Sequence, residues 1–201
     1  RLSSIIFLSL FFILVKANAQ NQYNVWYFGY DTVFTNPTAG LDFNGGAPVA
    51  LLNSAKPFSE GCATYCNSVG QILFYTGGDT IYDRTHKPMP NGGVDMYGST
   101  SSSIQSSVFV PVYGDTNTYY AFLNAGRNTA SLVGYAYYGK IDMTLNSGLG
   151  DVSGPLIDLI TGTSERLTAV KHCNGKDHWV LTNNHETNAF YAFRVTRCGV
   201  M

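Results

Sequence analysis

Short runs of apolar and β-branched residues, separated by polar turns, fill the chain after residue 20, and no stretch there sustains a helical apolar period. One unit contains the strand candidates "GCATYC", "ILFYT" and "DTIYD", separated by the turn "NSVGQ" and by Gly77-Gly78. A Gly-Gly pair between two β-rich runs favours a hairpin, because the turn requires positive φ. The "KPMPNGG" that follows is predicted to be a loop, since Pro88 and Pro90 cannot donate ladder hydrogen bonds.

The order of strand, polar turn and strand recurs twice downstream. The second unit contains "SSVFVPVYGDTNTYYAFLNAG" and "LVGYAYYGKIDMTL". The third unit consists of the strand candidates Leu167–Lys171, His178–Thr182 and Phe190–Thr196. Phe74, Tyr119 and Trp179 are approximate counterparts, at intervals of 45 and 60 residues. Propeller blades recur at roughly 40–50 residues, with insertions placed in loops. The longer second interval contains "PLIDLI", which is predicted to be the outer strand of a blade.

This repeat predicts an all-β fold, an incomplete β-propeller of about three antiparallel meander blades. The alternative is a β-sandwich, which also has many short strands at regular spacing. Because a closed propeller needs roughly four to eight blades, we expect an arc that is truncated at its C-terminal end. The remainder of a longer polypeptide would then cover its outer faces, near Trp26–Tyr30 and Phe190–Val195.

Residues 1–19 have the layout of a secretory signal peptide. Arg1 gives a positive start, Ile5–Val15 are apolar, and Ala17-Asn18-Ala19 fits a cleavage site. A membrane-spanning helix needs about 18 or more apolar residues, which is more than this segment offers. We expect cleavage after Ala19, a secreted or cell-surface mature domain of residues 20–201, and no membrane span within it.

Charge and composition narrow the classes of partner. The chain has 12 Lys+Arg against 13 Asp+Glu, and removal of residues 1–19 takes away Arg1 and Lys16. A mildly acidic chain without a basic stripe is poorly suited to neutralise phosphates, so no nucleic-acid partner is predicted. Charged residues form 12% of the chain and aromatic residues 14%, a composition that suits short strands joined by tight turns.

Asp79 and Asp83 are the carboxylates closest to a catalytic pattern. Two carboxylates that cleave a glycosidic bond lie about 5–9 Å apart, whereas positions four apart in a strand are separated by roughly 13 Å. Asp79 follows the glycine pair, so we predict that it accepts hydrogen bonds from turn amides. No G-x-S-x-G elbow, phosphate loop or dinucleotide fingerprint occurs. The sequence therefore predicts no catalytic residue and no enzyme activity.

Neither a metal site nor a cofactor site is predicted. In "GLDFNGG", Asp42 and Asn44 supply two oxygens where calcium takes six to eight, so a glycine turn is favoured and calcium is the minor alternative. His172 and His178 could face each other across a hairpin, but a zinc site needs three or four protein ligands. The four histidines form no H-E-x-x-H pattern and are expected to be solvated or hydrogen-bonded at strand ends; they are His86, His172, His178 and His185.

The surplus of aromatic residues is the feature most suited to binding. Its members are Trp26, Tyr27, Phe28, Tyr119, Tyr120, Tyr135, Tyr137, Tyr138, Trp179 and Tyr191. Because successive side chains of a strand point to opposite faces, we expect most of them to pack between blades and the others to face solvent. Exposed Tyr and Trp side chains form platforms for sugars or proteins.

The four cysteines are assessed by strand geometry. Cys62 and Cys66 lie four apart in one predicted strand, at about 13 Å, which exceeds the roughly 7 Å limit for a disulfide. Cys62 is therefore predicted to be a buried thiol. Export makes oxidation available, and Cys173 with Cys198 is the favoured pair. In a flat sheet these strand ends lie about 9–10 Å apart, so their loops would have to bend inward.

Four segments of the chain together carry a resemblance to a known family: "VWYFG", "AGLDFNGGAPVAL", "EGCATYCNSVGQILFYTGGDTIYDRTHKPMPNG" and "LTAVKHCNGKDHWVLTNNHETNAFYAFRVTRCGV". They resemble the N-terminal propeller-like region of large secreted proteins of gliding bacteria. Such proteins commonly end in a gliding-motility-associated C-terminal domain or a type IX sorting domain. The resemblance covers nearly all of the chain after residue 22 and is most specific over Gly40–Leu51 and Glu60–Gly92. Cys66 departs from it, because a small or acidic residue is expected there.

The resemblance implies export by the Sec route and a β-propeller used for binding or display. The function predicted is a non-catalytic extracellular or cell-surface module that binds a glycan or a protein in adhesion, gliding or surface display. The alternatives are a fragment of a secreted propeller hydrolase that acts on glycosides and a structural spacer in a larger adhesin. Such a hydrolase would place acidic residues at equivalent inner-strand positions, which here hold Glu60, Val108 and Leu167.

Overall fold

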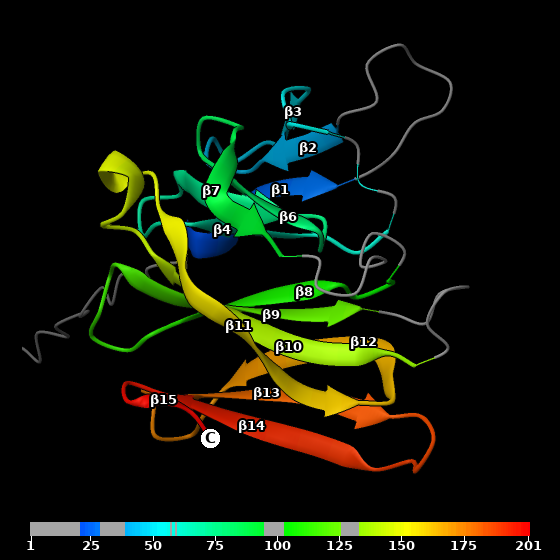
Figure 1. Cartoon of the computed structure of the whole chain (residues 1–201). Helices are drawn as coiled ribbons and strands as arrows, with labels where there is room; N and C mark the ends of the chain where they lie inside the picture. Colours follow the sequence, from blue (N-terminus) through cyan, green and yellow to red (C-terminus); the bar gives the residue numbers. More distant parts are fainter. Residues whose placement is uncertain (1–20, 29–38, 57, 59, 95–102, 126–132) are drawn as a thin grey trace, which may run out of the picture.

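The computed structural model describes residues 21–28, 39–56, 58, 60–94, 103–125 and 133–201. These residues form strands and two short 3₁₀ turns, Asn21–Tyr23 and Asn146–Gly148, without an α-helix (Figure 1). The all-β prediction is confirmed. No helix in this part of the chain is long and apolar enough to cross a membrane. The predicted signal peptide, residues 1–19, lies outside the described residues.

The described strands form four antiparallel sheets, each built from strands that are consecutive in the sequence. The first sheet contains β1 (Val25–Phe28), β2 (Ala39–Asp42) and β3 (Val49–Leu51). The second contains β4 (Ala63–Cys66), β5 (Ile72–Thr76), β6 (Thr80–Asp83) and β7 (Pro88–Gly93). The third contains β8 (Ser107–Pro111), β9 (Thr118–Ala125), β10 (Tyr135–Asp142) and β11 (Asp151–Thr161). The fourth contains β12 (Thr163–Lys171), β13 (His178–Asn184), β14 (Phe190–Thr196) and β15 (Gly199–Val200).

The three predicted units correspond to the second, third and fourth sheets. β11 contains "PLIDLI" and is an outer strand of the third sheet, as predicted. Gly78, with φ +100°, closes the predicted hairpin between β5 and β6. The number of about three meanders is wrong, because the described residues also form the first sheet. Its strands are only three or four residues long and carry little periodic signal.

Residues Pro88–Gly93 form the strand β7, so the prediction of a loop there is wrong. β7 is an outer strand of the second sheet and pairs irregularly with β6, through Thr80 with Gly93 and Tyr82 with Pro88. An outer strand uses only one of its edges for the ladder, so residues that cannot donate a hydrogen bond are tolerated on the other edge. The position of β7 in the sheet, rather than its composition, permits the prolines.

Alternation along β5 and β6 lets the second sheet contact two neighbours at once. Phe74 and Ile81 belong to a core shared with the third sheet, while Tyr75 and Tyr82 belong to a core shared with the first. A strand that is buried on both faces reads as a continuous apolar run, as "ILFYT" does. Phe74 and Ile81 are fully buried, and burial of such side chains stabilises the fold by about 1.5–3 kcal/mol each.

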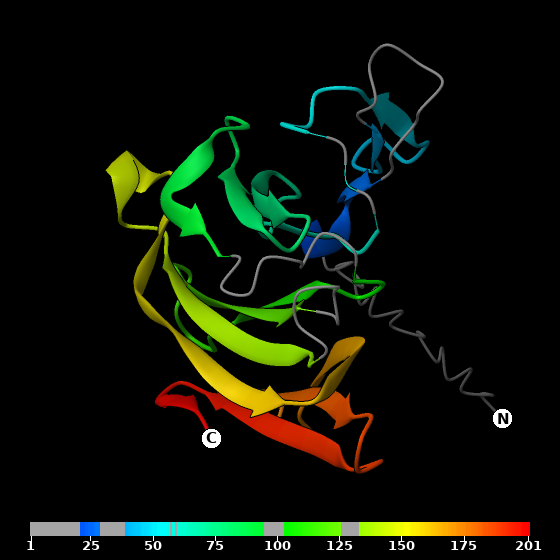
Figure 2. The same ribbon diagram turned by 45° about the vertical axis from the view of Figure 1, so that its right-hand side comes forward.

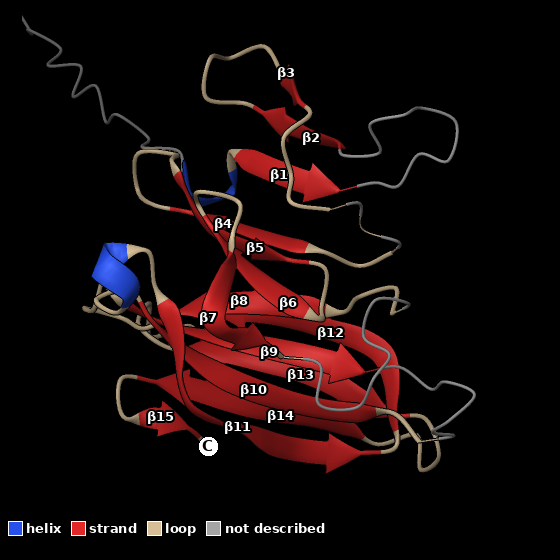
Figure 3. Ribbon diagram, turned by 45° about the horizontal axis from the view of Figure 1, so that its top comes forward, coloured by secondary structure: helices blue, strands red, loops and turns tan. Residues whose placement is uncertain are grey.

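The third sheet is buried on both faces in the same way. Ala121 and Leu123 of β9 face the second sheet, and Phe122 between them packs with Val180 of the fourth sheet. Figure 2 shows the sheets following one another in sequence order, from the first (blue to cyan) to the fourth (orange to red). Figure 3 shows the strands of the third and fourth sheets as two adjoining layers. Face-to-face packing of sheets is the packing of the β-sandwich alternative, here repeated between successive sheets.

Polar contacts fix the register between neighbouring sheets. Asp151 of β11 accepts hydrogen bonds from the backbone N (2.8 Å) and the side-chain amide (2.7 Å) of Asn91 in β7. Asn124 of β9 donates from Nδ2 to the carbonyl oxygen of Ser164 (2.5 Å) and accepts at Oδ1 from the hydroxyl of Thr163 (3.0 Å). Asp151, Asn124 and Thr163 are buried. A shifted sheet would leave these groups unsatisfied, at a cost of about 1–3 kcal/mol each.

Candidate binding cleft

The first strand of every sheet borders one cleft of about 770 Å³. β1, β4, β8 and β12 come from four separate parts of the sequence, and β13 adds His178 to the wall. The outer strands β7 and β11 lie beside each other and contribute no lining residue (Figure 1). Small-molecule sites commonly have volumes of about 300–1,000 Å³, so the cleft has room for a ligand of that class.

Aromatic rings line much of the cleft. Tyr23, Trp26 and Tyr113 expose 54%, 50% and 51% of their surface. The indole Nε1 of Trp26 donates to the carbonyl oxygen of Tyr23 (2.7 Å), and the indole ring lies 5.0 Å from the ring of Phe43. Tyr23 packs edge-on against Tyr65, with ring centroids 6.0 Å apart. Protein contacts therefore hold the rings of Trp26 and Tyr23 in place while about half of their surface stays open.

Side-chain hydrogen bonds join β1 to the start of the second sheet beside the cleft. The backbone N of Tyr27 donates to the hydroxyl of Thr64 (3.0 Å), and the Sγ of Cys62 donates to the carbonyl oxygen of Tyr27 (2.9 Å). Burial raises the pKa of Cys62 to about 11, so the thiol keeps its proton at neutral pH. The prediction that Cys62 is a thiol without a bridge to Cys66 is confirmed. Cys62 is half-buried, however, and Cys66 is the fully buried thiol.

Two lysines supply the charge of the cleft wall. Lys171 ends β12 and Lys176 lies in the turn that follows, and the described lining residues include no Asp or Glu. The ammonium nitrogen of Lys176 lies 5.7 Å from the centroid of the Tyr113 ring, within the range of a cation–π contact. The positive charge and the half-exposed ring therefore lie side by side in the wall.

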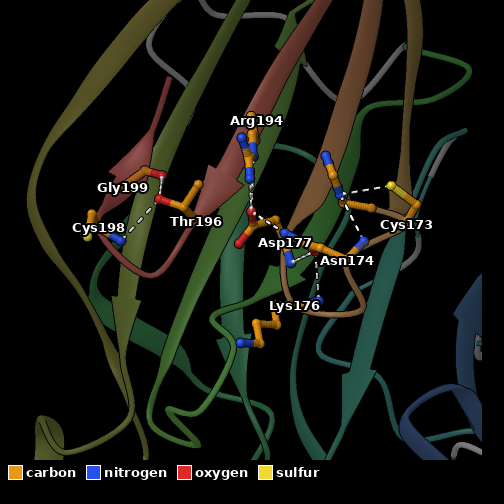
Figure 4. A network of polar contacts seen from close by, with 9 residues as sticks. Cys173, Asn174, Lys176, Asp177, Arg194, Thr196, Cys198 and Gly199 are labelled. Atoms are coloured by element: carbon orange, nitrogen blue, oxygen red, sulfur yellow. Dashed lines mark hydrogen bonds and ion pairs between the residues drawn. The ribbon is translucent and has the colours of Figure 1, made fainter.

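Asp177 fixes the turn that carries Lys176 (Figure 4). Its Oδ2 accepts hydrogen bonds from Nε (2.9 Å) and Nη2 (2.6 Å) of Arg194 and from Nδ2 of Asn174 (2.8 Å). The bonds from Asn174 and then from Arg194 lower the pKa of Asp177, so its carboxylate is charged at neutral pH. The side chain of Lys176 extends away from this network, although its backbone N donates to Asn174 Oδ1 (2.9 Å).

Two buried polar atoms on residues of the cleft wall have no hydrogen-bond partner in the described part of the chain. They are Oε1 of Gln22 and Nδ1 of His178. Burial lowers the pKa of His178, and the ammonium of Lys171 lowers it further, so the imidazole is neutral at neutral pH. A neutral imidazole and a carboxamide each offer both a donor and an acceptor. Either side chain would gain a hydrogen bond by turning toward a ligand hydroxyl.

Asp79 and Asp83 have structural contacts, and neither lines the cleft. Oδ2 of Asp79 forms an ion pair with Lys56, and its Oδ1 has no hydrogen-bond partner among the described residues, so the prediction that Asp79 accepts hydrogen bonds from turn amides is wrong. The hydroxyl of Thr76 takes that role and accepts a bond from the glycine turn (2.9 Å). Asp83 caps the next turn, where its Oδ1 accepts bonds from the backbone N and the hydroxyl of Thr85, both at 2.6 Å.

Asp42 and Asn44 form the turn that the sequence favours. Asp42 Oδ1 accepts a hydrogen bond from the backbone N of Asn44 (2.8 Å). Asn44 Oδ1 accepts from Asn24 Nδ2 (3.0 Å), and its Nδ2 donates to the carbonyl oxygen of Gly70 (2.9 Å), which links the first sheet to the second. Within the described residues, no group of three His, Cys, Asp or Glu side chains is placed to hold a metal ion.

The two histidines of the last hairpin do not face each other. His178 pairs with Lys171 across β12 and β13, whereas the ring of His172, one position further along, lies 5.4 Å from that of Trp179. Adjacent strand positions point to opposite faces, so the two imidazoles are on different sides of the sheet. The expectation of hydrogen-bonded histidines holds for three of them: His86 bonds Tyr75 and Asn53, His172 bonds Asn174, and His185 bonds Gly162. It does not hold for Nδ1 of His178, which is buried without a partner among the described residues.

Cys173 and Cys198 are exposed free thiols, and the predicted disulfide between them is wrong (Figure 4). Cys173 follows β12, Cys198 lies in the turn between β14 and β15, and β13 separates β12 from β14. Two strand spacings amount to about 9–10 Å, which exceeds the roughly 7 Å limit for a disulfide. The loops that carry Cys173 and Cys198 do not bend inward enough to bring the two thiols within bonding distance.

The predicted aromatic surplus divides between the cores and the cleft. Trp26, Tyr27 and Phe28 line the cleft. The core between the second and third sheets contains or contacts Tyr119, Tyr135 and Tyr137, and the core between the third and fourth sheets contacts Tyr120 and Tyr138. Trp179 and Tyr191 belong to the fourth sheet and line neither described cleft. Tyr27 also belongs to the core between the first and second sheets, so packing between sheets accounts for most of these residues, as predicted.

Sequence reasoning missed several residues of the cleft: Gln22, Tyr23, Gln105, Tyr113, Lys171 and Lys176. Each of them lies just before the first strand of a sheet, at the end of that strand or just after it. This common position relative to the first strands is the signal in the sequence that could have identified them. The positions compared for a hydrolase do not form a set, because Val108 lines the cleft, Leu167 is buried in a core and Glu60 is exposed.

Comparisons with protein-family models, with curated proteins and with solved structures found no match to this chain.

Proposed function

We propose that this chain is a non-catalytic extracellular or cell-surface module that binds a glycan in the cleft bordered by its four sheets. The observation that carries the proposal is that the same cleft is lined by half-exposed aromatic rings and by two residues that each have a buried polar atom without a hydrogen-bond partner among the described residues. A sugar ring has an apolar C–H face and a rim of hydroxyls. A site for it therefore needs a flat apolar surface and groups that both donate and accept hydrogen bonds.

The propeller interpretation of the fold belongs to this proposal. A propeller blade is a four-stranded antiparallel sheet beside a central channel. In this chain every sheet is a meander of consecutive strands, and its first strand borders the cleft. The second and third sheets are covered on both faces by their neighbours. On this interpretation the four sheets are blades of an arc, and the cleft is part of the channel.

The proposed location outside the cell rests on the sequence. Residues 1–19 have the layout of a signal peptide, and the segments after residue 22 resemble surface proteins of gliding bacteria. Adhesion, gliding or surface display are the processes in which such a glycan-binding module would act.

A second cleft, of about 800 Å³, lies along the fourth sheet and includes Ile104, Glu165, Arg166, His185 and Phe190. Most of its lining comes from β12, β13 and the segment that leads to β14. Gln22 and His178, the residues with unpartnered polar atoms, line the first cleft instead. This difference favours the first cleft as the glycan site.

The test is to screen the purified protein against an array of glycans and to measure each hit by isothermal titration calorimetry. Tyr113→Ala and Trp26→Ala should each weaken binding about two- to twelve-fold, because one aromatic contact contributes ~0.5–1.5 kcal/mol. Tyr191→Ala is the matched control, since this half-exposed tyrosine of β14 lies outside the cleft. Far-UV circular dichroism of each variant checks that the fold is kept.

Unchanged affinity in both cleft variants would contradict the proposed site. If the chain binds no glycan but binds a protein, and Tyr113→Ala weakens that binding, the ligand of the cleft is a protein and not a glycan.

A further inference from the structure

We infer that the glycan bound in the cleft is acidic, and that carboxylates of its uronate residues contact Lys171 and Lys176. This inference rests on the proposed function and deepens it, because the proposed function requires only that some glycan binds. It names the chemical class of the ligand, an oligosaccharide of hexuronate units.

The charge distribution in the cleft is the first reason. Lys171 and Lys176 are exposed, they line the same wall, and the described lining residues include no Asp or Glu to balance them. The ion pairs found among the described residues are Lys56 with Asp79 and Arg194 with Asp177. Neither cleft lysine is part of an ion pair there. The carboxylate next to Lys176 in sequence is engaged by Arg194 and Asn174.

The position of Lys176 over an aromatic ring is the second reason. Its ammonium nitrogen lies 5.7 Å from the centroid of the Tyr113 ring, and this ring is half-exposed. A pyranose that stacks on the exposed part of Tyr113 would bring its ring substituents close to the ammonium. A carboxylate on C5 of the sugar would form an ion pair with Lys176, whereas the uncharged hydroxymethyl group of a neutral hexose would accept a hydrogen bond from the ammonium without a charge of its own.

His178 adds a neutral hydrogen-bonding group beside Lys171. It stands opposite Lys171 in the β12–β13 ladder, and burial keeps its imidazole uncharged at neutral pH. The cleft therefore combines two cations for the carboxylates, a neutral side chain for the hydroxyls and a ring for the sugar face. An oligouronate, which carries both carboxylates and hydroxyls, matches this set of groups better than a neutral sugar does.

The test compares oligogalacturonate with the same oligosaccharide after methyl esterification, which removes the charge and keeps the sugar. An exposed ion pair stabilises by about 0.2–1 kcal/mol, so two lysines should favour the acid over the ester by about two- to thirty-fold at low salt. This preference should shrink as salt is raised to about 0.5 M, because exposed charges are screened. Lys171→Gln/Lys176→Gln should abolish the preference, because the acid then has no cation in the cleft wall to pair with.

Lys87→Gln is the matched control, because this exposed lysine lies in the turn after β6, outside the cleft. Equal affinity for acid and ester in the wild-type protein would overturn the inference while leaving a glycan site in place. The same holds if the acid binds the double variant as tightly as the wild type. If a sulfated galactan outcompetes oligogalacturonate and its binding depends on the same lysines, the anionic group that the cleft recognises is sulfate and not carboxylate. Binding of neither form, nor of any other glycan, would contradict the proposed function itself.

Discussion

Replacement of Phe74 by Ala should destabilise the protein by about 3–5 kcal/mol. Phe74 is fully buried in the core between the second and third sheets. Its ring lies 4.7 Å from that of Phe109, 5.2 Å from that of Tyr119 and 5.8 Å from that of Tyr65. Truncation removes the apolar burial, leaves a cavity and eliminates one stacked and two edge-on ring contacts. The affected core is the one through which two of the four sheets are held together.

The predicted loss is a large share of the roughly 5–15 kcal/mol by which a native domain is stable. For a domain of this size, each kcal/mol corresponds to about 2–4 °C, so the melting temperature should fall by about 6–20 °C. Urea unfolding followed by tryptophan fluorescence measures the change, since Trp26 and Trp179 lie in the first and fourth sheets. Cooperative unfolding of all four sheets requires the midpoint to fall without a change in the denaturant slope.

Phe190→Ala provides the control for removing a phenyl ring. Phe190 is 82% exposed, so its removal should change stability by less than about 0.5 kcal/mol. A loss below ~1 kcal/mol for Phe74→Ala would refute the reasoning, because it would show that the second and third sheets are not held together by this ring.

Three further outcomes are expected. Gly70→Ala should destabilise the protein by about 1–3 kcal/mol more than Gly114→Ala, as measured by urea unfolding. Both glycines have positive φ, but a Cβ at Gly70 would lie 1.9 Å from a side-chain oxygen of the turn after β2. Cys62 and Cys66, whose pKa burial raises to about 11, should resist iodoacetamide at pH 8 while the two exposed cysteines react, as mass spectrometry of the digest would reveal. Because burial lowers the pKa of His178, protons bind the unfolded chain first as pH falls below about 6.5, and stability should decline from there. His178→Gln should flatten this decline between pH 7 and pH 5, and an unaltered profile would contradict the assignment.

Local patterns were sufficient for most of the strands. "ILFYT", Gly78 and "DTIYD" predicted a hairpin because the turn needs positive φ and because strands buried on both faces are apolar throughout. The same reasoning located β13 and β14 to within a few residues. It failed for the first sheet, whose strands are too short to show a period, and for β7, where two prolines suggested a loop. Both errors concern strands whose existence depends on a neighbour rather than on their own residues.

Individual contacts were harder to predict than strands. Asp79 and Thr76 flank the same glycine turn, and only the tertiary structure decided that the hydroxyl would accept its amide while the carboxylate would pair with Lys56. The prediction of a disulfide between Cys173 and Cys198 was wrong because β13 lies between β12 and β14, the strands next to which the two cysteines stand. Such choices depend on distances between segments that are far apart in the chain.

By itself the sequence determined the all-β class, the order of meanders and the absence of a local catalytic motif, because these features are written in residues that are close together in the chain. The tertiary structure alone decided that alternate side chains of the middle sheets serve two different cores, since that depends on which sheet covers each face. It also decided that Tyr23, Tyr113, Lys171 and Lys176 share one cleft. Lys171 ends β12, and the other three residues lie just before β1, just after β8 and just before β13, so no local pattern relates them. Their meeting follows from how the first strands of four sheets are brought together when each sheet packs against the next.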